Sequence, residues 1–134
     1  MAVVRLQHTS VPMPPGAGAT ARHFYGTVLE MVEKIPPKSI IDEGLIWFHA
    51  GDDEIHLFRD ENPAGNERQH FCLQVDNLAH LRDQFAKHGV PVEETTAVPG
   101  RPRCFVHDPF GNRIELTEVQ GAYVAAKQTY EGKS

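Results

Sequence analysis

Four side chains of metal-binding type fall on segments of this sequence that read as β-strands, in a chain of 134 residues with eight histidines. Successive side chains of a strand point to opposite faces, so alternation decides which groups share a surface. Imidazole and carboxylate ligands together suit a divalent transition metal, and an octahedral shell keeps two positions open for water or substrate. We expect one polar surface to carry His8, His56, His70 and Glu115.

The alternation around these residues supports the shared surface. His56 stands between two apolar neighbours, Ile55 and Leu57, and His70 and Glu115 stand in equivalent alternating runs. The first strand alternates less clearly, because the face with the histidine is only partly polar. A single histidine on a strand is more often a hydrogen-bonded packing residue than a ligand, and a lone carboxylate is usually solvated. The metal interpretation depends on finding one candidate in each of four strands.

Other residues with chemical potential carry weaker patterns. The two cysteines, Cys72 and Cys104, do not make a disulfide framework, and we expect Cys72 to be a free core thiol. Trp47 is expected in the hydrophobic core. The remaining histidines singled out by position are expected on solvated helix surfaces or in turn packing, namely His23, His80, His88 and His107.

Composition excludes several classes of function. Lys and Arg total 13 against 18 Asp and Glu, the net charge is −5, and no basic run occurs. This balance argues against a nucleic-acid or anionic-membrane surface. No apolar stretch approaches the roughly 20 residues that span a bilayer, and the N-terminal residues lack the pattern of a signal peptide. We therefore expect a cytoplasmic protein without a nucleic-acid or membrane partner.

The elements that position the candidates recur in the same order. Hydrophobic periodicity and Gly and Pro breaks predict strand 3–11, helix 21–32 and hairpin 44–58, then strand 69–75, a helix from 78 to a stop at 89, and hairpin 103–118. Thr20 is the expected N-cap of the first helix, and Asp76 or Asn77 that of the second. One domain, 1–134, thus contains modules at about 3–59 and 69–118, with a tail at 119–134 that is helical or flexible. From element order alone, an unrelated α+β sandwich is the alternative.

Several segments resemble the vicinal oxygen chelate superfamily, the group of glyoxalases, bleomycin resistance proteins and extradiol dioxygenases. The resemblance runs from about Leu6 to Glu118, and its most specific part is the Asp-Pro-x-Gly-Asn-x-Ile-Glu pattern at 108–115. Shorter matching segments are Gln7-His8-Thr9, Arg22-His23-Phe24-Tyr25 and Gln69-His70-Phe71. The resemblance implies an α+β fold of two paired βαβββ modules, whose mixed sheet curls around a metal-binding cup.

The resemblance also implies roles for individual residues. The family's ligand positions on the first and last strands of each module match His8, His56, His70 and Glu115, in agreement with the alternation of the strands. The expected ion is a divalent transition metal, namely Zn, Ni, Mn, Fe or Co. Glu115 is then the expected catalytic carboxylate. Arg103 and Phe105 are expected to bind an anionic group of the substrate, with a rim salt bridge as the alternative for Arg103. Members of this type commonly form homodimers, and we expect one here, with ligands from the two modules meeting across the interface as one arrangement.

The resemblance leaves several chemistries open. We favour a glyoxalase-like metalloenzyme with lyase or isomerase chemistry through a metal-stabilised enolate or oxyanion, although His56 stands where glyoxalase I-like enzymes typically carry a second Glu. The main alternative is a non-catalytic small-molecule or drug-binding protein of the bleomycin-resistance type. A thiol transferase of the fosfomycin-resistance type fits less well, because residues 91–96 are acidic where a lysine is expected. An extradiol dioxygenase fits less well because most are about twice this length.

Overall fold

A computed structural model of the chain describes residues 2–40, 44–62 and 68–120. The chain divides into two compact units, Met1–Phe71 with His107–Arg113, and Cys72–Val106 with Ile114–Ser134. The α+β class expected from the sequence is confirmed, with a mixed sheet in each half of the chain. The predicted helical or flexible tail lies outside the described residues, apart from its first two positions. No helix within the described ranges is long and apolar enough to span a bilayer.

The first unit contains a four-stranded sheet in the order β1-β4-β3-β2. Its strands are β1 (His8–Met13), β2 (Glu33–Lys34), β3 (Ile46–Ala50) and β4 (Asp53–Arg59). β1 pairs with β4 in parallel, whereas β3 pairs antiparallel with both β4 and β2. The first strand thus begins five residues later than the sequence predicts, because Val3, Val4 and Leu6 are exposed and have no buried face to pack. The short β2 was not predicted.

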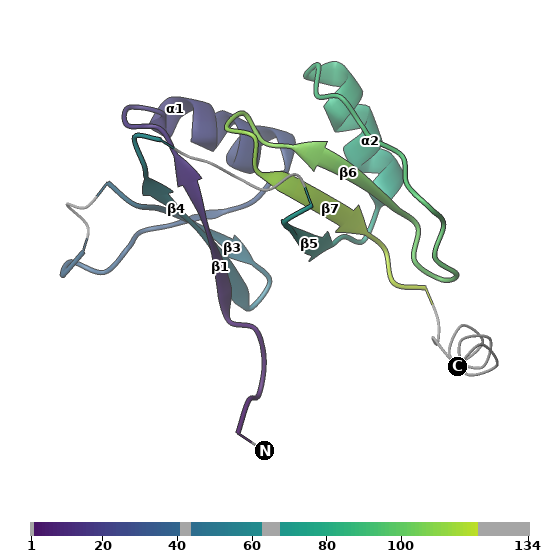
Figure 1. Cartoon of the computed structure of the whole chain (residues 1–134), viewed down its shortest axis with the longest axis horizontal. Coiled ribbons are helices and arrows are strands. Elements are labelled where there is room, and N and C mark those ends of the chain that lie inside the picture. The colour runs from purple at the N-terminus through teal and green to yellow at the C-terminus, as the bar shows by residue number, and fades with distance from the viewer. Residues whose placement is uncertain (1, 41–43, 63–67, 121–134) are drawn as a thin grey trace. The chain divides into compact units, whose positions relative to one another are not determined.

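A helical segment covers the apolar face of this sheet (Figure 1). It begins as α1 (Gly18–Ala21) and continues as a π-helical stretch, η1 (Arg22–Val28). Phe24, Tyr25 and Val28 from this segment are buried. The helix begins at Gly18, before the predicted cap Thr20. Ala17 occupies the N-cap position and makes no side-chain hydrogen bond there. The helix also ends before the predicted 32, since the wider π spacing brings the Leu29 amide to the Phe24 carbonyl at 2.9 Å and Glu30 then adopts a positive φ of 60°.

The second unit contains most of a three-stranded sheet in the order β5-β7-β6, with a helix beside it (Figure 1). The strands are β5 (His70–Gln74), β6 (Arg103–His107) and β7 (Arg113–Thr117), and the helix is α2 (Leu78–Lys87). The predicted cap of α2 is confirmed at Asn77, whose side chain accepts a hydrogen bond from the His80 amide at 3.0 Å. Leu78, Leu81 and Phe85 form the buried stripe of α2, as their spacing predicts.

The turn between β6 and β7 is a structural anchor of the first unit. Asp108 is buried and accepts hydrogen bonds from the Tyr25 hydroxyl at 2.6 Å, from the amides of Phe110 and Asn112, and from the Asn112 side chain at 2.7 Å. The Asn112 side chain also donates to the Pro12 carbonyl at 2.9 Å. Burial, followed by the charge of Asp108, raises the pKa of Tyr25 well above its usual range. Residues 108–112 of the most specific motif therefore fix packing, whereas its last residue, Glu115, lies on β7.

Substituting Asp108 tests this anchor. The Asp108 carboxylate accepts four hydrogen bonds, two at each oxygen. In Asp108→Asn one oxygen is replaced by an NH₂ group that cannot accept, so buried donors lose their partner. We expect the free energy of unfolding to fall by about 1–3 kcal/mol, as measured by urea denaturation. The matched control is Asp83→Asn on the exposed side of α2, for which we expect a change within about 0.5 kcal/mol. Equal effects in the two variants would contradict the anchoring role.

Candidate functional site

One face of the first sheet collects polar and aromatic side chains from all four strands. In the register of the sheet, His8 pairs with Glu54, and Trp47 pairs with His56. Lys34 pairs with Trp47 and so lies on the same face. Ile55 and Leu57 belong to the opposite face of β4 and are buried, and Glu54 and His56 are buried as well.

Three rings on this face stack on one another and form what we call the ring stack, namely Trp47, His56 and His8. The Trp47 and His56 ring centroids are 3.8 Å apart with planes 2° from parallel. The His56 and His8 centroids are 4.2 Å apart with planes at 19°. Trp47 is half-buried on the polar face, so its predicted place in the core is wrong. Its parity with exposed His49, rather than with buried Phe48, is the sequence feature that could have shown this.

Glu54 ties the ring stack to the edge strand β2. One carboxylate oxygen of Glu54 accepts from His56 Nε2 at 2.8 Å, and the other pairs with the Lys34 ammonium. Only 9% of the Glu54 side chain is exposed, so these contacts are shielded from water. The hydrogen bond from Lys34, and then that from His56, lower the pKa of Glu54 to about 2. Glu54 is therefore an anionic anchor for His56.

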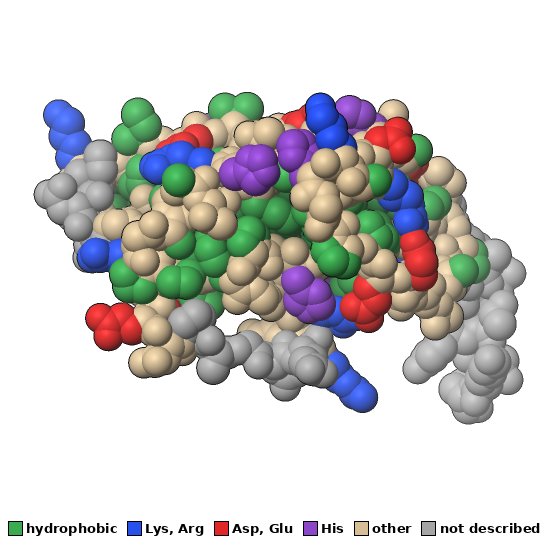
Figure 2. Space-filling model, turned by 90° about the horizontal axis from the view of Figure 1, so that it is seen from above, with side chains coloured by type: hydrophobic (Ala, Val, Ile, Leu, Met, Phe, Trp, Pro, Cys, Tyr) green, Lys and Arg blue, Asp and Glu red, His purple; other side chains and the backbone are tan. Residues whose placement is uncertain are grey.

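His8 and His70 share a feature of ligand histidines. His8 Nδ1 lies 2.5 Å from the Gln7 side-chain oxygen, and His70 Nδ1 lies 2.9 Å from the Arg68 carbonyl oxygen. An oxygen acceptor requires Nδ1 to carry the hydrogen, so the neutral ring keeps its lone pair on Nε2. Metal-binding histidines usually have their second nitrogen held in this way. Histidine side chains reach the molecular surface in more than one place on the face drawn in Figure 2.

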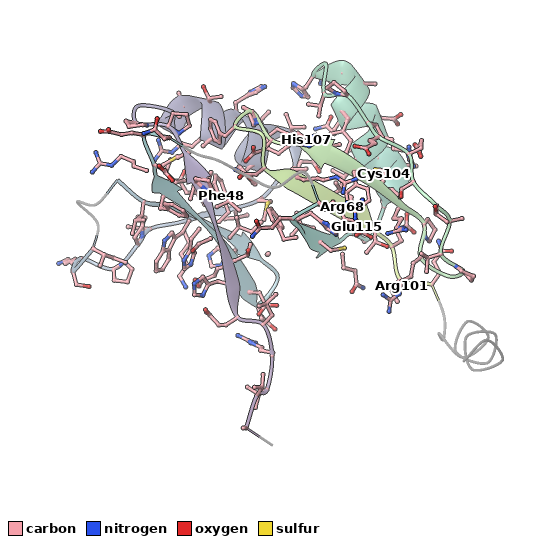
Figure 3. All side chains as sticks on the ribbon, in the orientation of Figure 1. Phe48, Arg68, Arg101, Cys104, His107 and Glu115 are labelled. Atoms are coloured by element: carbon pink, nitrogen blue, oxygen red, sulfur yellow. The ribbon has the colours of Figure 1, made fainter. Side chains whose placement is uncertain are left out.

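Glu115 lies on β7 of the second sheet, where Figure 3 labels it, and its side chain is 13% exposed. Arg103 donates to a Glu115 carboxylate oxygen at 3.3 Å and to the Thr96 carbonyl at 2.9 Å. The predicted substrate residue Arg103 thus orients Glu115. Phe105, the other predicted substrate residue, is 4% exposed and pairs through its backbone with Glu93. Substrate binding by these two residues stays a prediction.

Cys72 lies near the Glu115 carboxylate. Burial of the thiol, followed by the negative charge of Glu115, raises the pKa of Cys72 to about 11, although Arg101 and Arg103 oppose the shift. Cys72 is exposed as a residue, which is inconsistent with the predicted core position. Such a thiol is largely protonated near neutral pH, and therefore is a poor nucleophile.

The predicted ligands are divided between the units. The structure brings His8 and His56 together in the first unit, to which His70 also belongs, whereas Glu115 belongs to the second. Within either unit, no group of three or more His, Cys, Asp or Glu among the described residues is arranged to hold a metal ion. A cavity of about 550 Å³ in the first unit is lined by residues such as Met13, Ile46 and Arg59, and by none of the predicted site residues.

Sequence reasoning missed Lys34 as part of this face. Lys34 follows a helix and precedes two prolines, so no strand pattern of useful length surrounds it. Glu54 has the same parity as His56, so alternation predicts it on the polar face as a possible second carboxylate, but its pairing with Lys34 was not predicted.

The sequence profile of the Glyoxalase/Bleomycin resistance protein/Dioxygenase superfamily matches residues 5–116. Among curated protein sequences, none matches this chain. A glyoxalase-family protein from Bacillus anthracis has a similar crystal structure, with a TM-score of 0.84 and 32% sequence identity over 90% of this chain and 98% of that chain.

More distant solved structures share the fold. A lactoylglutathione lyase from Agrobacterium tumefaciens is 21% identical, with a TM-score of 0.65, over 88% of this chain and 96% of that chain. A fosfomycin resistance protein from Mesorhizobium loti is 13% identical, with a TM-score of 0.69, over 93% of this chain and 98% of that chain.

Proposed function

The chain belongs to the Glyoxalase/Bleomycin resistance protein/Dioxygenase superfamily, and from this membership we propose that it is a metal-dependent enzyme acting on a small molecule. Its chemistry is of the glyoxalase type, in which a proton next to a carbonyl is removed and the resulting charge is stabilised. The superfamily contains many enzymes, and a lactoylglutathione lyase is among the proteins that share the fold. The substrate of this chain is a separate question, because fold alone does not select it.

The observation that carries the proposal is the orientation of the two first-strand histidines. His8 and His70 each have Nδ1 bonded to an oxygen, which supports Nε2 as the ligand nitrogen in both. Glu115 supplies the anionic oxygen that completes a His, His, carboxylate donor set, and this set fits a divalent transition metal. We propose that these three residues hold the ion.

The chain's own residues then have separable tasks. Gln7 and the Arg68 carbonyl fix the two imidazole rings, and Arg103 fixes the carboxylate of Glu115 while remaining bonded to Thr96. A bound divalent ion would supply positive charge that stabilises an enolate or oxyanion of the substrate. Glu115 is the carboxylate proposed to accept or return a proton at the substrate carbon.

Metal analysis of the purified protein tests the proposal. We expect close to one divalent ion per proposed site, in protein purified without a metal-affinity column. A panel of small 2-oxo compounds and their thiol adducts is then screened for exchange of the carbon-bound hydrogen with deuterium from solvent. A metal-free protein that binds small molecules without any exchange or turnover would refute the enzyme and support the binding-protein alternative.

We also propose that the protein is a homodimer, as expected from the resemblance. Two-fold homodimers are by far the commonest assemblies of soluble oligomers. A solution mass of one chain by light scattering at micromolar concentration would refute this proposal.

A further inference from the structure

His56 occupies the middle of the ring stack and is the most enclosed of the predicted ligands. The indole of Trp47 covers one face of its ring and the imidazole of His8 covers the other. Its side chain is 11% exposed. Both ring faces of His56 are therefore committed to aromatic neighbours.

One edge nitrogen of the His56 ring, Nε2, is committed to a carboxylate. Nε2 donates to Glu54 at 2.8 Å, and Glu54 is itself held by Lys34. A carboxylate anchored by an ammonium group is a strong acceptor, because charge-assisted hydrogen bonds are about twice as strong as neutral ones. Nε2 of His56 therefore carries a hydrogen, and Nδ1 is the ring nitrogen that keeps an in-plane lone pair.

The stacking geometry also separates His56 from His8 as a pair of ligands. A histidine ligand binds with a lone pair that lies in the plane of its ring, at a metal–nitrogen distance of roughly 2.0–2.1 Å. With planes 19° apart and centroids separated by 4.2 Å, the two ring planes meet only far beyond that distance. One ion does not lie in both ring planes while the rings remain stacked.

We propose that His56 is a positioning residue for His8 and not a metal ligand. The proposal rests on the proposed function, in which His8 binds the ion. Glu54 holds one edge nitrogen of His56, and Trp47 stacks on one face of its ring. The opposite face stacks on the His8 ring and sets the orientation of that ring. Nδ1 of His8 is also held by the Gln7 side chain. Contacts within the sheet thus restrict the orientation of a proposed ligand on the edge strand β1.

Two substitutions of His56 separate a stacking role from a ligand role. His56→Phe keeps a flat ring between Trp47 and His8 but provides no donor atom, whereas His56→Ala removes the ring altogether. Affinity for Co²⁺ is measured by competition with a chelator, and the visible absorption spectrum of bound Co²⁺ reports the ligand set. We expect His56→Ala to lower affinity about 10–100-fold, as for other residues that orient ligands. We expect His56→Phe to restore affinity to near the wild-type value with an unchanged Co²⁺ spectrum.

The sole tryptophan provides a readout that does not depend on metal. Trp47 Nε1 is buried with no hydrogen-bond partner in the described part of the chain, so ring contacts hold the indole in place. We expect Trp47 fluorescence to change in His56→Ala and to change less in His56→Phe. The matched control is His49→Phe, which alters an exposed histidine on the same face but outside the ring stack. It is expected to leave affinity, spectrum and fluorescence unchanged.

The outcomes separate this inference from the proposed function. Equal loss of Co²⁺ affinity in His56→Phe and His56→Ala, with an altered spectrum, would show that His56 is a ligand while leaving the metal enzyme intact. Unchanged affinity in His56→Ala would show that the ring stack does not position His8. A wild-type protein that binds no Co²⁺ would refute the metal site and the positioning role together.

Discussion

Replacing Glu115 with glutamine is expected to remove most of the bound divalent metal while the fold persists. Glutamine keeps the shape of the side chain but removes the anionic charge. Glu115 supplies the only carboxylate in the proposed donor set. Affinity for the ion should fall by more than about 100-fold, beyond the loss typical of residues that merely orient ligands. The second sheet should remain folded, because Ile114 and Leu116, on the other face of β7, are fully buried and unchanged.

Glu94→Gln is the matched control for this substitution. Glu94 is an exposed carboxylate of the same unit, and it pairs with Arg82 rather than with Arg103. Metal content is measured by elemental analysis, and folding by far-ultraviolet circular dichroism. Unchanged metal occupancy in Glu115→Gln would show that Glu115 is not a ligand, whereas loss in both variants would indicate a general effect of charge.

The sequence predicted those parts of the fold that depend on local periodicity. In β4 and β7 the period of two is imposed by the backbone itself, so buried and polar faces follow directly from the residue order. In α2 the apolar stripe of Leu78, Leu81 and Phe85 and the cap at Asn77 lie within a single helix. Each of these features is settled by residues close in the chain, and each was predicted correctly.

Features that depend on pairing between distant segments were not predictable in the same way. The Glu54 carboxylate meets Lys34 only because β2 joins the sheet beside β3, and a two-residue strand leaves no periodic pattern. Trp47 is different, because its place opposite His56 is set within one hairpin and its parity with His49 indicates the polar face. A hydrophobicity scale places an indole in the core, whereas here a stacked imidazole covers it.

In the candidate site, too, local alternation was predictable and contacts between segments were not. Alternation predicted that His56, His70 and Glu115 stand apart from their apolar neighbours. Around His70 and Glu115 exposure alternates in this way, whereas in β4 Glu54 and His56 are buried together with Ile55 and Leu57. Alternation gives no information about hydrogen-bond partners, which come from other strands or loops. The contacts of Glu54 with His56 and of Arg103 with Glu115 therefore had to be found in three dimensions.

Metal affinity is expected to fall steeply as the pH is lowered from about 8 to 5. Each ligand histidine must be neutral to bind, so protons compete with the ion for the imidazole lone pair. Once the pH lies below the pKa of a ligand imidazole, binding of the ion displaces one proton from that ring. The apparent affinity therefore falls more steeply with pH when more histidines bind the ion.

The slope of this profile counts the histidines that bind the ion. With His8 and His70 as ligands and His56 in the ring stack, the logarithm of the affinity approaches a slope of two per pH unit at low pH. The measurement is competition with a chelator of known pH dependence, repeated on His56→Phe, which should give the same slope as the wild type. A slope of three that falls to two in His56→Phe would instead make His56 a ligand. A flat profile, or affinity too weak to measure at pH 8, would remove the histidine site and favour a protein that binds its small molecule without metal.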